Sequence, residues 1–375
     1  MRVASIRILI VAGLFLLAAH HVHAQGWISQ SSGTTSSING VHFVDDNTGT
    51  VVTSNGSIIR TTNGGTTWTM QSSGVSGSLN GVFFINALTG TAVGNGGTIL
   101  KTTNGGLTWS LQIRGSENLN DVYFPDPNDG TIVGNTGVIL HTTDGGNTWT
   151  NQAGGSSNLK GVWFVDANVG TIVGSSGIIL RTTTGGATWV SQTGGNSMNL
   201  DDVCLTDANT GTAVGAGGLI LQTINGGAMW TTQTSGTTQA LHGVHFTNTL
   251  KGTAVGENGT ILRTTDGGST WISQTSGVTN ALFKVFFSHA NVGTAVGASG
   301  TILRTTSGGV NCPAISLSPN SLPAGTALSP YSQTLSATGG VSPYSFAVTI
   351  GTLPEGINME EYLKTGLVWP KEDAS

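Results

Sequence analysis

The chain has 375 residues, of which only 8% are Asp, Glu, Lys or Arg, against about 25% in an average soluble protein. Glycine supplies 58 residues, which excludes an ordinary helical protein because glycine weakens helix interiors. The formal net charge of -5 argues against nucleic acid as a partner, since phosphate binding needs a basic footprint.

The first 24 residues have the features of a secretion signal. Arg2 and Arg7 give a positive start, residues 8–19 are apolar, and the small residues before Gln25 suit cleavage after Ala24. This apolar run is too short to span a bilayer core of about 30 Å as a helix. We therefore expect a mature chain that is secreted, periplasmic or on the cell surface, with no membrane span.

An eight-residue phrase, Thr61 to Trp68, returns in altered form along almost the whole mature sequence. The tryptophans that end it are separated by 40 or 41 residues, and a further step of 41 reaches Cys312. The seven tryptophans are Trp27, Trp68, Trp109, Trp149, Trp189, Trp230 and Trp271. A fixed period of this size indicates a repeat architecture, in which each unit packs against its neighbours.

Each repeat unit reads as four short strands separated by turn residues. In the first unit we expect strands at residues 38–44, 50–53, 57–62 and 67–71. The first turn of most units holds an acid or amide four residues before a glycine, as with Asp45 and Gly49. We expect the side-chain oxygen to accept a turn amide and the glycine to adopt a positive φ.

Four antiparallel strands in each of seven units predict an all-β, seven-bladed β-propeller over residues 25–312. The seventh unit lacks its own fourth strand, whereas residues 26–32 copy only the end of a unit. We expect this N-terminal segment to pair into the last blade and close the ring, which removes two exposed sheet edges. The closed ring is expected to be a monomer.

The composition changes after Cys312. Residues 313–357, with motifs at 315–325 and 331–340, resemble the opening of an immunoglobulin-like domain family common in bacterial surface proteins. The match covers about half of a sandwich of roughly 100 residues. Residues 358–375 are unlike that family, and we expect a disordered tail. Cys204 and Cys312 lie in different repeats, so we expect two unpaired, mostly buried thiols.

The repeated phrase resembles the Asp-box, or bacterial neuraminidase repeat, of pattern Ser/Thr-x-Asp-x-Gly-x-Thr-Trp. The copies with Asp144 and Asp266 fit it fully, and Asn63, Asn104 and Asn225 hold the acid position in three others. In that family the phrase is the hairpin between the third and fourth strands of a blade. The resemblance implies structural roles: the Asp or Asn oxygen receives turn amides, and the tryptophan packs into a neighbouring blade.

The longer consensus joins Gly-Val-x-Phe, Gly-Thr-Ala-Val-Gly and Gly-Thr-Ile-Leu-Arg-Thr-Thr-Asp-Gly-Gly-x-Thr-Trp. Over residues 26–312 it resembles the propeller family that includes the photosystem II assembly and stability factors. Photosynthetic members of that family act as lumenal assembly chaperones, and many bacterial proteins share the repeat without photosynthesis. The resemblance implies an exported, non-catalytic scaffold that binds a protein or glycan partner, with no cofactor and no metal.

The alternative is a glycoside hydrolase, sialidase-like or acting on a polysaccharide. A sialidase is disfavoured because its three arginines must converge, whereas the arginines here are spread around the ring. Loops before first strands and between second and third strands share one face of a propeller. On that face we expect Asn120, Asp121, Lys160, Asp201, Asp202, His242 and Glu257. Asp201 and Glu257 are candidates for a catalytic acid and base pair. The alternative is that these side chains are simply solvated at a polar opening of the central channel.

Two further sets of residues repeat in phase. Basic side chains occupy one third-strand position in five blades, as Arg60, Lys101, Arg181, Arg263 and Arg304. They form either a basic stripe for an acidic partner or stems packed on tryptophan with their heads in water. The residue after the first-strand valine varies and includes His42, Cys204 and His245, for which we expect packing between blades rather than a metal site.

Overall fold

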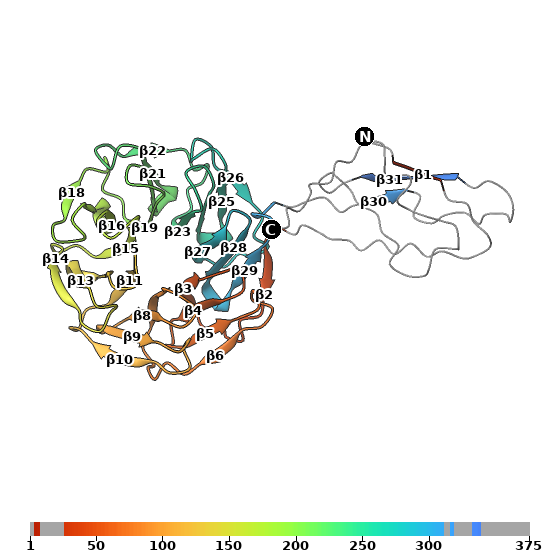
Figure 1. Ribbon diagram of the computed structural model, residues 1–375. Helices are drawn as coiled ribbons and strands as arrows, with labels where there is room; N and C mark the ends of the chain where they lie inside the picture. Colours follow the sequence, from red (N-terminus) through yellow and green to blue (C-terminus); the bar gives the residue numbers. More distant parts are fainter. Residues whose placement is uncertain (1–3, 8–25, 311–315, 319–331, 339–375) are drawn as a thin grey trace, which may run out of the picture. The chain divides into compact units, whose positions relative to one another are not determined.

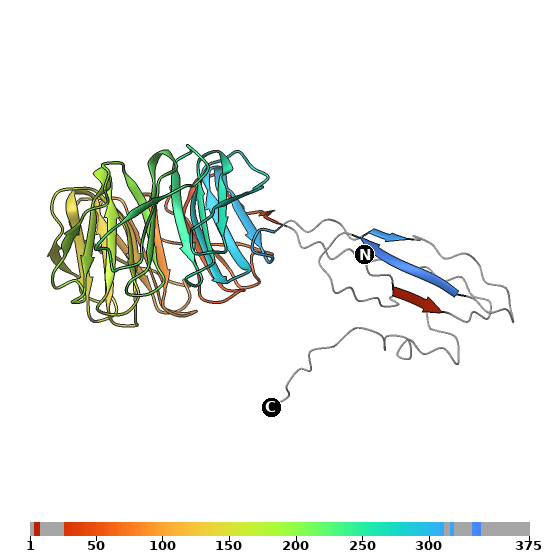
Figure 2. The same cartoon turned by 90° about the horizontal axis from the view of Figure 1, so that it is seen from above.

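The computed structural model describes residues 4–7, 26–310, 316–318 and 332–338. The chain divides into two units, one spanning Gly26–Val310 and the other made of Met1–Gln25 with Asn311–Ser375. The larger unit is a closed ring of seven four-stranded antiparallel sheets, seen along its axis in Figure 1. Figure 2 shows the same ring from the side, with the strands running between its two faces. The predicted seven-bladed propeller is confirmed.

The blades follow one another along the chain. Blade one contains β3 (Ile38–Phe43), β4 (Gly49–Thr53), β5 (Ile58–Thr61) and β6 (Thr69–Gln71), and blade two contains β7 (Leu79–Phe84), β8 (Gly90–Gly94), β9 (Thr98–Thr102) and β10 (Ser110–Ile113). Blade three contains β11 (Leu119–Tyr123), β12 (Gly130–Gly134), β13 (Val138–Thr142) and β14 (Thr150–Ala153), and blade four contains β15 (Leu159–Phe164), β16 (Gly170–Gly174), β17 (Ile179–Thr182) and β18 (Val190–Gln192). Blade five contains β19 (Leu200–Leu205), β20 (Gly211–Gly215), β21 (Ile220–Thr223) and β22 (Thr231–Gln233), and blade six contains β23 (Leu241–Phe246), β24 (Gly252–Gly256), β25 (Ile261–Thr264) and β26 (Ile272–Gln274).

Blade seven is completed by the N-terminal strand. It contains β27 (Leu282–His289), β28 (Val292–Gly297), β29 (Ile302–Thr305) and β2 (Ile28–Gln30). The strand order is β2-β29-β28-β27, with Ile28 opposite Arg304. Trp27 is 9% exposed and packs edge-on against Phe287, with ring centroids 5.8 Å apart. The predicted closure of the ring by residues 26–32 is confirmed.

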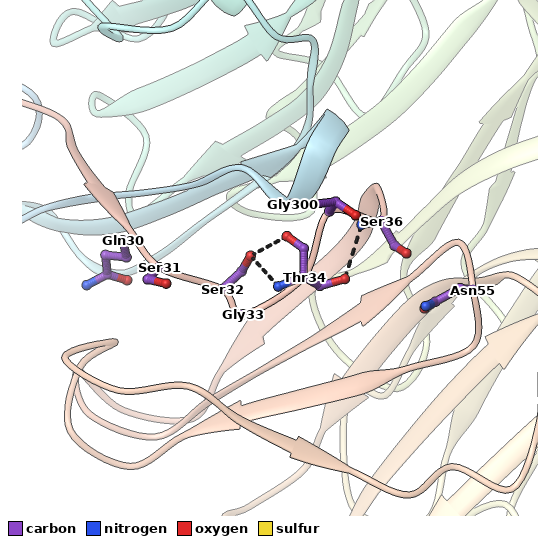
Figure 3. A pocket seen from close by; sticks show the side chains of 9 residues that line it. Gln30, Ser31, Ser32, Gly33, Thr34, Ser36, Asn55 and Gly300 are labelled. Carbon is purple, nitrogen blue, oxygen red and sulfur yellow. Dashed lines mark hydrogen bonds between the residues drawn. The ribbon is translucent and has the colours of Figure 1, made fainter.

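The segment between β2 and β3 carries the chain from blade seven to blade one. Its residues line an open pocket together with Asn55 and Gly300 (Figure 3). The Ser32 hydroxyl donates to the Thr34 carbonyl at 3.1 Å, and the Ser36 amide donates to the Thr34 hydroxyl at 3.1 Å. These local bonds fix the path of the segment through a turn rich in small polar residues.

Burial follows the position of each strand within its blade. Every position of the second strands is buried, as in β4, and these strands carry small and β-branched residues. The first strands surround the axis and the fourth strands lie at the periphery (Figure 1). The core lies between blades: Ile38, Val51 and Ile59 of blade one pack with Val296 and Ile302 of blade seven.

Short 3₁₀ turns follow the second strands of blades three to seven. They are η1 (Asn135–Gly137), η2 (Ser175–Gly177), η3 (Ala216–Gly218), η4 (Glu257–Gly259) and η5 (Ala298–Gly300). Each joins a second strand to a third strand, so they lie on the face that also carries the loops entering the first strands.

The first turn of each blade departs from the prediction in one respect. Asp45 accepts the amides of Asn47 and Thr48 at 2.7 and 2.6 Å, as expected. Gly49 does not have a positive φ, and that prediction was wrong. A Cβ at Gly49 would lie 2.4 Å from the ring of Phe43, so the glycine makes room for an aromatic side chain on the neighbouring strand.

The smaller unit contributes a separate sheet of order β1-β31-β30, from β1 (Ala4–Arg7), β30 (Ser316–Ser318) and β31 (Ser332–Thr338). The predicted signal peptide is described only over β1, and the immunoglobulin-like segment only over β30 and β31. Cys312 and the predicted tail at 358–375 lie outside the described residues. Within the described part of the chain, the helices are too short or too polar to cross a membrane.

Candidate functional site

The repeated phrases that end in tryptophan form self-contained turns. The Thr61 hydroxyl accepts the Gly65 amide at 2.9 Å, and the Asn63 side chain accepts the Thr67 amide at 2.9 Å. In the third copy, hydrogen bonds from Thr148 hold the pKa of Asp144 well below its usual range. The other aspartate copy, Asp266, and the asparagine copies Asn104 and Asn225 make equivalent bonds. These residues shape the hairpin, which agrees with the role implied by the resemblance.

The tryptophans of the repeated phrase pack their rings within their own blade, and four of them bond through Nε1 to the preceding blade. Trp68 packs edge-on against Phe43 of its own blade, with centroids 6.0 Å apart, and its Nε1 donates to Gln30 of the preceding blade at 3.2 Å. Trp27, Trp189 and Trp230 make the same bond to Gln274, Gln152 and Gln192. In these four copies the indole ring rests on its own blade and its nitrogen bonds to a neighbour, rather than the ring packing wholly into a neighbour. Trp109, Trp149 and Trp271 repeat the ring packing.

The basic residues of the third strands connect neighbouring blades. The Arg60 guanidinium lies over the Phe84 ring of blade two at 4.9 Å and donates to the Thr50 hydroxyl at 2.9 Å and the Ala87 carbonyl at 2.6 Å. Arg181, Arg263 and Arg304 bond to the same kinds of partners. Lys101 instead donates to Asn147 at 2.7 Å.

These arginines differ from both arrangements expected from the sequence, which were an open basic stripe and stems packed on tryptophan with the heads in water. Arg263 and Arg304 are each 7% exposed, and their heads lie over phenylalanine rings rather than tryptophan. The reason is positional: the first-strand phenylalanine and a free turn carbonyl of the next blade are the nearest partners. Each guanidinium donates two hydrogen bonds within the ring, one to its own blade and one to the next, so these groups stabilise the ring.

A charged triad, made of Asp121, Asp202 and Lys284, lies on the axis of the ring. The Lys284 ammonium is 2.9 Å from the Asp202 carboxylate and 3.4 Å from that of Asp121. Asp202 also accepts the Val244 amide of blade six at 3.0 Å. Burial opposes the charge of Lys284, but the two carboxylates outweigh it and raise the pKa of Lys284. Burial raises the pKa of Asp202, and Lys284 offsets part of that rise.

Beside the triad lies a closed circle of six aromatic rings, which we call the aromatic collar. Its members are His42, Phe83, Tyr123, Trp163, His245 and Phe286, with centroids of adjacent rings 4.3 to 5.4 Å apart. Blade five contributes the small Cys204 at this position, and Trp163 reaches across it to His245. Packing between blades was the expectation for these positions.

Burial keeps the titratable groups of the collar neutral. Desolvation lowers the pKa of His42 and of His245 to about 3, and it raises the pKa of Tyr123. The Phe84 amide donates to Nδ1 of His42 at 3.3 Å, whereas Nδ1 of His245 is buried without a partner among the described residues. Cys204 is a free, buried thiol, and desolvation raises its pKa.

The triad and the collar line one cavity of ≈ 280 Å³, which we call the axial pocket. Its wall also includes Gly40 and Gly81 of blades one and two, which contribute no side chain. Asp121, Asp202 and Lys284 occupy the same first-strand position as Gly40 and Gly81, in blades three, five and seven. The other four blades have glycine at this position. A Cβ at Gly243 would lie 2.9 Å from Cα of Lys284, so this glycine provides room for the charged residue of the next blade.

Four side chains on blades four to six form the polar rim: Lys160, Asp201, His242 and Glu257. Asp201 lies 2.5 Å from the Lys160 ammonium and 2.7 Å from Nδ1 of His242, and Nε2 of His242 lies 2.9 Å from Glu257. Hydrogen bonding to Asp201 raises the pKa of His242. Burial opposes the charge of Asp201, but bonds from His242 and Lys160 outweigh it and lower the pKa of Asp201.

The sequence candidates thus separate into three groups. Lys160, Asp201, His242 and Glu257 meet in the rim, whereas Asp121 and Asp202 enter the axial pocket. Asn120 donates to the Leu159 carbonyl of blade four at 2.6 Å, a link between blades. Asp201 and Glu257 are bridged by one imidazole, and the lowered pKa of Asp201 does not suit a general acid. This geometry gives the hydrolase reading no support.

Sequence reasoning missed Lys284. The signal that could have found it is a charged residue at a position where most repeats have glycine, combined with aspartates at the same position of two other blades. The described residues contain no group of three or more His, Cys, Asp or Glu side chains that could hold a metal ion.

The fold and these contacts define a closed propeller whose blades contain the repeated turns and are joined to one another by interblade hydrogen bonds and cation–π contacts. The model of the family described as photosynthesis system II assembly factor YCF48 matches residues 19–119, 74–153, 110–195 and 229–333. Together these ranges span more than half of the chain, and the chain belongs to this family.

Solved structures support the fold. The chain is similar to "YCF48 bound to D1 peptide", with a TM-score of 0.64 and 22% identity over 79% of this chain and 100% of that one. It is similar to YCF48 from Cyanidioschyzon merolae, with a TM-score of 0.64 and 20% identity over 75% and 98%. It is also similar to the WD40 propeller domain of Doa1, with a TM-score of 0.61 and 15% identity over 74% of this chain and 96% of that one. A comparison with curated proteins found no match.

Proposed function

We propose that this chain is an exported, non-catalytic scaffold that binds a segment of a protein partner during assembly of a larger complex. The observation that carries the proposal is the match of the assembly-factor family model along the propeller. A solved YCF48 structure with a bound D1 peptide supports it, because a propeller of the same fold there holds a peptide.

We place the contact at the polar rim. The side chains of Lys160 and Glu257 are 33% and 44% exposed, whereas Asp201 and His242, which hold them, are 17% and 21% exposed. The exposed charges are therefore held in one geometry before a partner arrives, which reduces the entropy lost on binding. Arg181, Arg263 and Arg304 suit this task less well because they are buried and each already donates two hydrogen bonds within the ring.

Export is the second part of the proposal. The basic start, the apolar run at residues 8–19 and the cleavage signal before Gln25 support it. N-terminal sequencing of the protein purified from the native host's envelope fraction should begin at Gln25. A protein that keeps Met1 and stays in the cytoplasm would remove export from the proposal and leave scaffold binding intact.

Binding can be measured on an array of 15-residue peptides that tile the envelope proteins of the host. We expect a restricted set of peptides to bind, and Lys160→Met and Glu257→Gln each to weaken binding about tenfold. Lys251→Met is the matched control because Lys251 lies in the turn between β23 and β24, on the opposite face of the ring. Equal binding by all three variants would place the contact elsewhere, and a lack of any peptide binding would overturn the proposal.

The same preparation tests the hydrolase alternative. The full chain is incubated with a panel of sialylated glycans and polysaccharides, alongside Asp201→Ala and Glu257→Ala. We expect no turnover above that of a boiled control. Turnover that disappears in either variant would replace the scaffold with a glycoside hydrolase.

A further inference from the structure

The axial pocket combines features that the proposed scaffold function does not use. It is a cavity of ≈ 280 Å³ on the axis, close to the lower end of the range of about 300–1,000 Å³ usual for small-molecule sites. Its wall is the aromatic collar, and one end carries the charged triad. Two glycines, Gly40 and Gly81, leave one side of it without side chains.

The collar has the geometry of a cation receptor. Its six rings close on themselves, with adjacent centroids 4.3 to 5.4 Å apart. The centre of a six-membered circle lies as far from each vertex as adjacent vertices lie from each other. If the circle is close to planar, a cation at its centre would lie about 5 Å from each ring centroid, within the roughly 6 Å range of a cation–π contact for every ring that turns its face inward.

The charges around the pocket favour a cation over an anion. The triad has two carboxylates and one ammonium, and the collar histidines stay neutral because burial lowers the pKa of His42 and His245 to about 3. The charges of Arg263 and Lys284 add to the lowering for His245, but Arg263 does not line the pocket. The Nδ1 atom of His245 is buried without a partner among the described residues, and His245 lines the pocket. It is therefore available to a polar group of a ligand.

Lys284 does not fill the collar with its own ammonium. Lys284 and Phe286 are two residues apart on β27, so their side chains share a face but lie about 7 Å apart along the strand. The Lys284 ammonium is held by both aspartates of the triad. The collar thus has its own place for a positive charge.

We propose that the axial pocket binds one small organic cation of the alkylammonium or quaternary ammonium class at the centre of the aromatic collar. Binding takes place without covalent chemistry. The proposal does not depend on the scaffold function, because none of the polar rim residues lines this pocket.

Choline and its neutral isostere 3,3-dimethylbutan-1-ol are the matched probes, because they share shape and hydroxyl and differ in charge. They are titrated into the full chain by calorimetry up to about 10 mM, with proton NMR of the N-methyl groups. We expect choline to bind at least tenfold more tightly than the isostere, and its N-methyl signals to shift upfield in the ring currents of the collar. No choline binding in this range, or equal binding of both probes, would overturn the proposal.

Two collar variants separate a receptor from a packing role. Phe83→Leu keeps apolar volume but removes one π face, so the preference for choline over the isostere should fall by about threefold. Tyr123→Phe keeps the ring and should leave that preference unchanged. Thermal unfolding verifies that each variant folds. If Phe83→Leu does not fold, Tyr123→Leu is used in its place. An unchanged preference in the folded leucine variant would refute the role of the collar.

Discussion

Replacement of Trp27 by alanine tests how far the segment at residues 26–32 stabilises the closed ring. Trp27 is 9% exposed and donates its Nε1 to Gln274 of blade six at 2.9 Å. An aromatic side chain buries roughly 150–250 Å², which at about 25 cal/mol per Å² corresponds to about 4–6 kcal/mol. Part of this is retained by alanine, so we expect Trp27→Ala to lower the free energy of unfolding by about 3–5 kcal/mol.

Trp271→Ala is the matched control, because Trp271 is also 9% exposed and packs on Phe246 with centroids 5.9 Å apart. Its strand, β26, continues from an Asp-box hairpin, whereas β2 is joined to its blade only through β29. Both variants should lose similar stability in urea unfolding, but only Trp27→Ala should speed hydrogen exchange in β29. A loss below about 1 kcal/mol, or unchanged exchange in β29, would refute this account of closure.

Three further predictions follow from particular contacts. Gly49→Ala should cost about 1–3 kcal/mol because its Cβ would meet the Phe43 ring, whereas Gly77→Ala, with open space around it, should be close to neutral in urea unfolding. Lys284→Met leaves two carboxylates unpaired and should cost about 3–5 kcal/mol, against less than about 1 kcal/mol for Lys160→Met at the rim. Equal costs would argue that the triad is hydrated. The pKa of His242 is raised above 6.5 in the folded protein, so its stabilising contribution is complete below that value and is lost as pH rises through the folded pKa. The free energy of unfolding should therefore fall as the pH rises above about 6.5, and His242→Gln should flatten this dependence.

The chemistry of the repeats made much of the fold predictable. The Asp-box bonds form between residues within a few positions of one another, as between Thr61 and Gly65, so local sequence specifies them. The fixed period of 40 or 41 residues then sets the number of blades, and the missing fourth strand of the last unit indicates the closure by β2. The positive φ predicted for Gly49 was wrong because its reason is a neighbouring ring, which turn chemistry alone does not reveal.

The site depended on the tertiary structure. Sequence placed Asp201, His242 and Glu257 on one face, but only the ring geometry shows that one imidazole bridges both acids. Lys284 lies 163 positions from Asp121, and nothing in a linear pattern states that their side chains meet on the axis. Local order came from the sequence because turns and strands depend on near neighbours. The triad, the collar and the partners of each third-strand arginine were decided by the tertiary structure, because closing the ring brings residues of different blades together.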